Sequence, residues 1–365
     1  MKLSKVSIFG CIILFLFASC SQLSQQTEAS GLYPIFQNGK VGFIDKNGKV
    51  VVEPQFDPAV FCTYQFYEGL ACVSVGGKIG FIDTTGKIVI KPQFDTQLLP
   101  FSEGLAAVYV GNKWGYINAK GEYVVNPQYD SAGSFSEGLA AVTVVNKVGF
   151  IDKTGKMVIE PKFQAAGQFS EGLAVVILPE SVSRDIGEKI GFIDKTGKMV
   201  IEPQFSNGQR ANFPMFINGL ASVVSIDNKK TGFIDKTGKF IIAPQFDDAG
   251  FWQQGDSIAW HNKLNYQFPM KAISGGKVGF IDKMGKYVIN PQYDGGNNFS
   301  DGLAPILVNK KYGYIDTTGK MIIEPQFDSA GIFIDGLAMV TIGTSPNAKI
   351  GYIDKTGKYI WSSTL

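Results

Sequence analysis

Residues 139–172 read LAAVTVVNKVGFIDKTGKMVIEPKFQAAGQFSEG, and recognisable copies of this stretch fill most of the chain. Self-similarity at a roughly fixed period sets the architecture of a protein before any local pattern is considered. Within the stretch, LAAVTVV, VGFID and KMVIEP are short runs of β-branched and aromatic residues bounded by turn residues. The unit is therefore predicted to be three antiparallel strands followed by a loop.

The turns of the unit follow from its Asp, Gly and Pro residues. Asp152 and Gly155 lie between the second and third runs, where an Asp side chain caps a turn and Gly supplies a left-handed residue. Pro161 ends the third run because proline has no N–H to donate to a sheet. An Asp recurs at the position of Asp152 in eight of the copies, and Asn118 replaces it in the third. A row of carboxylates could bind metal, but exchange of Asp for Asn favours turn capping.

Nine copies are counted from the glycine of the second run. It recurs at Gly42, Gly80, Gly115, Gly149, Gly191, Gly232, Gly279, Gly313 and Gly351. Both faces of each predicted sheet are apolar, so each sheet has to be covered on two sides by stacked neighbours. We expect the repeated glycine to allow close approach between neighbouring units. The fold class is all-β, with nine three-stranded antiparallel units stacked as an open or loosely closed superhelix, or as a propeller in the alternative.

The pattern resembles the WG-repeat family, whose unit places a Gly before an aromatic residue, Ile and Asp and ends in a Phe-x-x-Gly-Leu-Ala motif. The resemblance extends from about Leu32 to the C-terminus, although only Trp114-Gly115 is a literal Trp-Gly pair. It implies a β-repeat scaffold, and the family brings no catalytic residue with it.

The N-terminus has the features of a targeting segment. Lys2 and Lys5 precede an apolar run that is too short to span a bilayer. The run ends in Ala18-Ser19-Cys20, which resembles the cleavage site of bacterial lipoproteins, where the cysteine receives lipid. Residues 1–19 are thus predicted to be a signal peptide, 20–31 a flexible tether and 32–365 the repeat domain. A plain secretory signal is the alternative.

Composition excludes several classes of function. The chain has 34 Lys and Arg against 32 Asp and Glu, a balance that points to no nucleic-acid partner. His261 is the single histidine, which removes His-based metal clusters and Ser-His-Asp or Cys-His nucleophiles. We expect no metal, no cofactor and no enzyme activity.

Two features depart from the repeat. Cys62 and Cys72 either form a disulfide, which export would permit, or remain two buried thiols. The sixth copy carries an insertion containing Trp252, Trp260 and His261, residue types that suit stacking on a sugar or peptide. The alternative is that the insertion only packs on its own neighbours.

These patterns together predict a binding scaffold. We expect an exported, lipid-anchored protein of the bacterial envelope, at the outer membrane or cell surface, that binds a protein, peptide or glycan and meets the membrane only through its anchor. A carbohydrate-active hydrolase on the same scaffold is the alternative, because repeated β scaffolds can hold pairs of carboxylates. A hydrolase requires two unique acids that converge, whereas a scaffold shows only acids at equivalent positions of the repeat.

Overall fold

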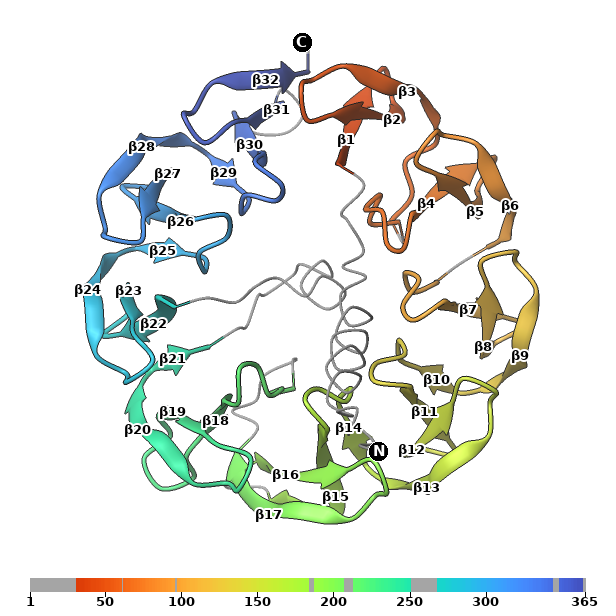
Figure 1. The fold of residues 1–365 in the computed structure, drawn as a ribbon, viewed down its shortest axis with the longest axis vertical. Coiled ribbons are helices and arrows are strands. Elements are labelled where there is room, and N and C mark those ends of the chain that lie inside the picture. Colours follow the sequence, from red (N-terminus) through yellow and green to blue (C-terminus); the bar gives the residue numbers. More distant parts are fainter. Residues whose placement is uncertain are drawn as a thin grey trace, which may run out of the picture.

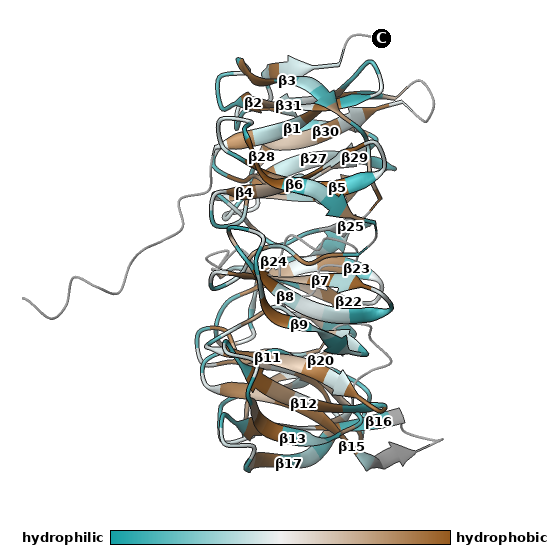
Figure 2. Cartoon of the chain, turned by 90° about the vertical axis from the view of Figure 1, so that its right-hand side faces the viewer, coloured by the Kyte–Doolittle hydropathy of each residue, from teal (hydrophilic) through white to brown (hydrophobic). Residues whose placement is uncertain are grey.

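The computed structural model describes residues 31–60, 62–95, 97–183, 187–206, 213–250, 268–343 and 348–363. Within these ranges the protein is all-β, as predicted, and its sheets form a ring (Figure 1). No helix in these ranges is long and apolar enough to cross a membrane. Seen from the side, the ring is a flat disc (Figure 2).

Nine units, numbered here in chain order, make up the described ring, and each contains three antiparallel strands. The first strands are β1 (Leu32–Gln37), β4 (Leu70–Val75), β7 (Leu105–Val110), β11 (Leu139–Val144), β15 (Leu173–Ser183), β18 (Ala221–Val224), β22 (Met270–Ser274), β26 (Leu303–Val308) and β30 (Ala338–Ile342). The second strands are β2 (Lys40–Asp45), β5 (Lys78–Asp83), β8 (Lys113–Asn118), β12 (Lys147–Asp152), β16 (Gly187–Asp194), β19 (Thr231–Ile234), β23 (Lys277–Ile281), β27 (Lys311–Asp316) and β31 (Lys349–Ile353). The third strands, on the outer rim in Figure 1, are β3 (Val50–Phe56), β6 (Ile88–Phe94), β9 (Tyr123–Tyr129), β13 (Met157–Phe163), β17 (Met199–Ser206), β20 (Phe240–Phe246), β24 (Tyr287–Tyr293), β28 (Met321–Phe327) and β32 (Tyr359–Ser362).

Five of the described connections between units contain a further short strand that the sequence did not predict. Each of these strands pairs with the first strand of the unit that follows it; they are β10 (Ser131–Ala132), β14 (Ala165–Ala166), β21 (Asp248–Ala249), β25 (Gly295–Gly296) and β29 (Ser329–Ala330). They give units 4, 5, 7, 8 and 9 a fourth strand. Units 5 and 6 are also joined, because Ser206 at the end of β17 pairs with Val224 of β18.

The repeated glycine of the second strand does make a close backbone approach, but within its own unit. A Cβ on Gly149 would lie 2.5 Å from the Ile159 carbonyl oxygen and 2.8 Å from the Pro161 nitrogen, both on β13. The expectation that this glycine allows close approach between neighbouring units is wrong. The register of β12 and β13 shifts between the Val148–Phe163 and Phe150–Ile159 pairs, which brings the backbone before Pro161 over the glycine.

The contact between units instead uses the glycine of the second turn. A Cβ on Gly155, whose φ is +86°, would lie 2.8 Å from a methyl carbon of Val125 in the preceding unit. Gly121 has the same relation to Ile90, and Gly197 to Ile159. One glycine per turn therefore both adopts a left-handed conformation and lets the turn rest on its neighbour.

Aromatic pairs fill the space between units. In seven units the aromatic residue of the second strand packs on the Phe that leads into the next unit, with ring centroids 4.7–5.2 Å apart. The pairs are Phe43–Phe66, Phe81–Phe101, Tyr116–Phe135, Phe150–Phe169, Phe192–Phe216, Phe280–Phe299 and Tyr314–Phe333. Most of these rings are fully buried. These rings therefore join each of these units to the next.

The ring closes without a covalent bond between unit 9 and unit 1. No Phe precedes β1 at the position of Phe135, and Tyr33 supplies the missing ring, 5.4 Å from Tyr352. The Tyr352 hydroxyl donates to the Pro34 carbonyl (2.9 Å), as Tyr314 does to Gly331 in the preceding unit. Of the arrangements considered from the sequence, the structure has the closed, propeller-like one.

Candidate functional site

The site residues predicted from the sequence fall mostly outside the described ranges. Cys20, Trp252, Trp260 and His261 all lie there. Cys62 and Cys72 are described, and both are buried thiols of one apolar cluster.

The base of the sixth-copy insertion is described and well fixed. Gly250 and Lys271 flank it, and both bond to the buried side chain of Asn298 in unit 8. The Lys271 N–H donates to the Asn298 oxygen (2.8 Å), and the Asn298 amide donates to the Gly250 carbonyl (3.1 Å). One buried side chain thus holds the two ends of the insertion together.

The described surface nearest the axis is a circle of tight turns, each leading into a first strand (Figure 1). In unit 4 the turn is Ser136-Glu137-Gly138-Leu139, closed by two backbone hydrogen bonds between Ser136 and Leu139. Glu137 and Gly138 have φ of 54° and 86°, the pattern of a type I′ turn. Left-handed backbone is unusual for Glu, and the same sign recurs at Glu68, Glu103, Glu171, Asp301 and Asp335.

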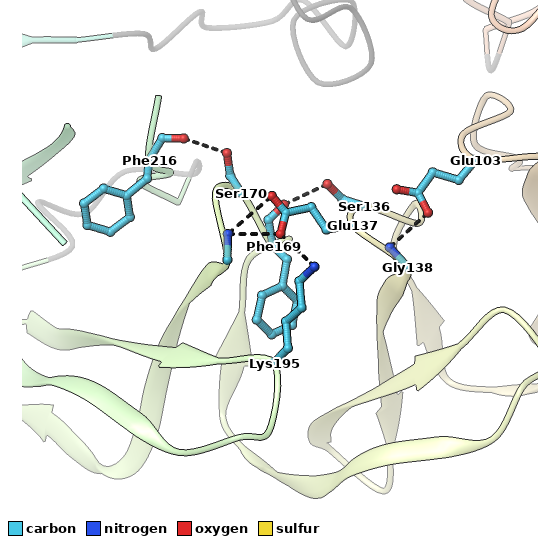
Figure 3. A network of polar contacts seen from close by, with 9 residues as sticks. Glu103, Ser136, Glu137, Gly138, Phe169, Ser170, Lys195 and Phe216 are labelled. Carbon is cyan, nitrogen blue, oxygen red and sulfur yellow. Dashed lines mark hydrogen bonds and ion pairs between the residues drawn. The ribbon is translucent and has the colours of Figure 1, made fainter. Parts of the chain in front are cut away.

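The described turns of this kind are 67–70, 102–105, 136–139, 170–173, 217–220, 300–303 and 334–337, and we call them the turn ring. Five of them bond to the next turn along the chain, and Figure 3 shows part of this network. The acid accepts from the Gly N–H of the following turn at 2.7–3.0 Å, in the pairs Glu68–Gly104, Glu103–Gly138, Glu137–Gly172, Glu171–Gly219 and Asp301–Gly336. The serine donates to the carbonyl of the following Phe at 2.6–2.7 Å, in the pairs Ser102–Phe135, Ser136–Phe169, Ser170–Phe216 and Ser300–Phe333. These hydrogen bonds explain why an acid occupies a left-handed position.

Lysines neutralise one part of the turn ring. Lys153, Lys195 and Lys236 lie 3.0–3.1 Å from Glu103, Glu137 and Glu171 respectively. Unit 3 has Ala119 at the position of Lys153, which leaves Glu68 without that partner. Asp301 and Asp335 have shorter side chains, and neither forms an ion pair with a described residue. The turns before units 8, 9 and 2 therefore carry acids that no lysine neutralises.

Among the described carboxyl groups, Asp335 has a pKa raised above its ordinary value. Burial raises it first, and the charge of Asp301 on the neighbouring turn adds to the shift. The Tyr33 hydroxyl donates to the Ile334 and Asp335 carbonyls at 3.0 and 3.1 Å, so this pair of acids adjoins the closure of the ring. Burial also raises the pKa of Tyr33. The two acids occupy equivalent positions of the repeat.

A second set of aspartates fastens neighbouring units together. Asp130 accepts from Lys113 of its own unit (2.6 Å) and from the Val145 N–H of the next unit (2.9 Å). Asp57, Asp247, Asp294 and Asp328 repeat this double contact. The hydrogen bond from Lys113, followed by that from Val145, lowers the pKa of Asp130.

The aspartates after each second strand cap turns, as predicted. Asp152 accepts from the Thr154 hydroxyl (2.6 Å) and from the Thr154 and Lys156 N–H groups (2.9 and 3.1 Å), and these bonds lower its pKa. Asn118 makes the corresponding backbone contacts through its side-chain oxygen. In the described ranges no group of three His, Cys, Asp or Glu residues is placed to hold a metal ion.

The outer wall is where the units differ most at exposed positions. Eight of the nine third strands present an aliphatic side chain that is 37–49% exposed, namely Val51, Val89, Val124, Val158, Val200, Ile241, Val288 and Ile322. Two residues later on the same face the side chain varies, as Glu53, Lys91, Asn126, Glu160, Glu202, Ala243, Asn290 and Glu324. A constant apolar position thus alternates with one whose charge changes from unit to unit.

The sequence reasoning missed the turn ring, Asn298 and the closure residue Tyr33. The acid-Gly pair that precedes six of the nine first strands was a usable signal, because two adjacent residues of that kind favour a type I′ turn. Asn298 offered no comparable signal, since its role depends on two backbone groups far away in the sequence.

A match to one solved structure supports the fold. A chain described as the eukaryotic initiation factor matches with a TM-score of 0.66 and 15% identity, covering 92% of this chain and 96% of that one. AztD from Citrobacter koseri matches with a TM-score of 0.42 and 11% identity, covering 92% and 94%. A search of curated protein sequences gave no match.

The family follows from the repeats themselves. The family described as WG containing repeat matches residues 42–78, 79–114, 114–147, 149–178, 190–229, 232–262, 279–312 and 312–343. These matches cover well over half of the chain and run through the second and third strands around the ring. The chain belongs to the WG-repeat family.

Proposed function

We propose that the protein is an exported, lipid-anchored repeat scaffold that binds a protein, peptide or glycan partner in the cell envelope. The observation that carries this proposal is the use of the repeated polar residues by the ring itself. Asp152 caps a turn, Asp130 fastens two units, and Glu137 links two turns of the turn ring. Residues that make these hydrogen bonds hold the scaffold together. We therefore expect a partner to be bound by residues at positions that differ between units.

Two sets of positions meet that condition. The first is the insertion that carries Trp252, Trp260 and His261, whose base Asn298 fixes to unit 8. The second is the varying position on the outer wall, such as Lys91 and Glu160. We favour the insertion, because tryptophan offers a large flat contact area and is enriched among residues that dominate binding.

Export and anchoring rest on Ala18-Ser19-Cys20 and the apolar run before it. Stable attachment needs more than one acyl chain, since each buried CH₂ contributes about 0.8 kcal/mol. We expect Cys20→Ala to remain unprocessed or to leave the membrane fraction. Fractionation of cells producing wild type and variant tests this, and a Cys20→Ala protein that is processed normally and stays on membranes contradicts the anchor.

Binding is tested with two envelope probes, purified peptidoglycan sacculi and detergent-solubilised envelope protein. A binding tryptophan costs about 2 kcal/mol or more of affinity when truncated, with little effect on thermal stability. A buried tryptophan costs about 3–5 kcal/mol of stability instead. Trp252→Ala and Trp260→Ala are compared with Met284→Ala, a control that removes an apolar side chain 71% exposed in the neighbouring unit.

The outcomes of that comparison are distinct. Loss of binding in one tryptophan variant, with an unchanged melting temperature, supports the insertion as the binding element. Unchanged binding in both tryptophan variants, together with loss in Lys91→Glu or Glu160→Lys, moves the site to the outer wall. No binding of the wild type to either probe argues against an envelope scaffold.

A cell-envelope hydrolase is the second candidate, and Asp335 is the observation in its favour. A carboxyl with a raised pKa beside a second carboxyl is the arrangement of a general acid and its partner. Asp301 and Asp335 are equivalent repeat residues, however, and Asp301 already bonds to the Gly336 N–H (2.7 Å). If sacculi release soluble fragments on incubation with wild type but not with Asp335→Asn, the hydrolase replaces the scaffold.

A further inference from the structure

The connection between units 1 and 2 is built differently from the others that are described. Like the connection between units 2 and 3, it has a single bridge, here between Asp57 and Ser74, in place of a short fourth strand. Its distinctive feature is the packing of Tyr64. Tyr64 has a left-handed φ of 57°, its ring packs edge-on against Phe36, and its hydroxyl bonds to the backbone of Ala59. This connection therefore has contacts of its own in place of the shared pattern.

The two described cysteines lie at the centre of this connection. Cys62 belongs to the connection and Cys72 to β4, and both are buried in the same apolar cluster. The two thiols hydrogen-bond each other. The backbone N–H groups of Thr63 and Tyr64 also donate to the Cys72 sulfur, so the chain just after Cys62 is folded around it.

We propose that Cys62 and Cys72 form a disulfide bond that locks the connection between units 1 and 2 onto β4. The inference draws on the proposed export, because exported proteins meet the oxidants that form disulfides. Its geometry is independent of that proposal: two thiols in mutual contact need little backbone movement to be bridged.

The chemistry balances as thiol–disulfide exchange with a small or protein disulfide, R–S–S–R. The Cys62 thiolate attacks one sulfur of R–S–S–R, which forms a mixed disulfide and releases R–S⁻. The Cys72 thiolate then attacks the Cys62 sulfur and expels the second R–S⁻. The two cysteines are oxidised, R–S–S–R is reduced to two R–SH, and the two thiol protons pass to the products.

Cys72 is suited to the second step. Burial of its sulfur disfavours a thiolate, but hydrogen bonds from the Cys62 thiol and from the Tyr64 and Thr63 N–H groups together lower the pKa of Cys72. Cys62 lies on a connection whose neighbouring Val60 is 94% exposed. A local opening of the connection is thus sufficient to bring Cys62 to the oxidant while β4 stays in place.

The test uses the full chain extracted from cells in detergent. Free thiols are first blocked under denaturing conditions with one maleimide, and the protein is then reduced and labelled with a heavier one. We expect Cys62 and Cys72 to carry the heavier label, and the unreduced protein to yield a Cys62–Cys72 cross-linked peptide by mass spectrometry. Reduction should lower the melting temperature of the wild type by about 5 °C and leave Cys62→Ala unchanged.

A second arm separates this inference from export. Reduced, purified protein is incubated in a glutathione/glutathione-disulfide buffer and digested for the same peptide. Formation of the cross-link in buffer together with free thiols in cells supports the pair and argues against export. Failure to form the cross-link in both arms overturns the disulfide, whatever the location of the protein.

Discussion

The glycine of the second strand gives the sharpest test of the fold, and Gly149→Ala is the perturbation. The added Cβ would lie 2.5 Å from the Ile159 oxygen, 2.8 Å from the Pro161 nitrogen and 3.1 Å from the Glu160 carbonyl carbon. All three atoms are backbone, so no side chain can rotate away to make room. Either β12 or β13 has to shift, in the middle of a buried sheet.

The magnitude follows from that geometry. Overpacking of a well-packed interior costs about 1–3 kcal/mol, and we expect at least 2 kcal/mol here because only backbone can yield. Gly133→Ala in the same unit is the matched control. Its nearest neighbour would be the Ala141 oxygen at 3.6 Å, which is ordinary contact. A Gly to Ala change without strain stabilises by about 0.4–1 kcal/mol through the unfolded chain.

The assay is a urea titration of wild type and both variants. Tryptophan fluorescence, to which Trp114 buried in the adjacent unit 3 contributes, supplies the signal, with far-UV circular dichroism as a second probe. We expect the midpoint to fall for Gly149→Ala and to stay level or rise for Gly133→Ala, with equal slopes. Equal midpoints for the two variants would refute the argument that the β12–β13 backbone contact requires glycine.

Three further changes test other parts of the ring. Tyr33→Phe removes the hydrogen bonds to the Ile334 and Asp335 carbonyls and should lower the free energy of unfolding by about 1 kcal/mol. Tyr33→Ala also removes the ring, so it should lower that free energy by about 3–5 kcal/mol and speed hydrogen exchange first in units 1 and 9. Exchange that is equally fast around the whole ring contradicts this. Asn298→Ala leaves the Lys271 N–H and the Gly250 carbonyl without that partner and should lower stability by about 1–3 kcal/mol in a urea titration, so an unchanged midpoint refutes the clamp. Asp335→Asn should raise the melting temperature at pH 7, because the pKa of Asp335 is higher in the folded protein than its unfolded value of 3.8 and ionisation therefore destabilises the fold. This gain should shrink as the pH falls through the folded pKa and vanish below about 3.8. A gain in melting temperature that persists below that pH excludes the charge as its cause.

The strands and turns could be predicted because each is encoded locally. In the run from Val148 to Asp152 the alternation of faces, the Asp cap and the turn glycine all lie within a few residues. The partner of Gly149 could not be predicted in the same way. In a regular antiparallel pair Gly149 would lie opposite a single residue of β13. In the structure the register of β12 and β13 shifts near Pro161, and this shift depends on how the two strands pair.

Closure of the ring depends on one residue that departs from the repeat. Tyr33 occupies the strand position of Ala71, Ala106 and Ala140, and its ring fills the space that a preceding Phe fills elsewhere. The substitution is visible in the sequence once the copies are aligned. Its meaning appears only when Tyr352, distant in the chain, lies beside it.

The same distinction explains why the site was harder to predict than the fold. The structural residues of a repeat can be recognised because each recurs at the same position in several copies. Contacts such as that of Asp152 with Thr154 accordingly recur around the ring. Residues that bind a partner occur in only one copy, so no repeated pattern identifies them in the sequence. The departures from the repeat are therefore the places to search, and the described ones already have physical roles: Tyr33 closes the ring, Asn298 clamps an insertion, and Cys62 meets Cys72. Trp252, Trp260 and His261 are departures of the same kind, and this places them first among the positions to be tested for a partner.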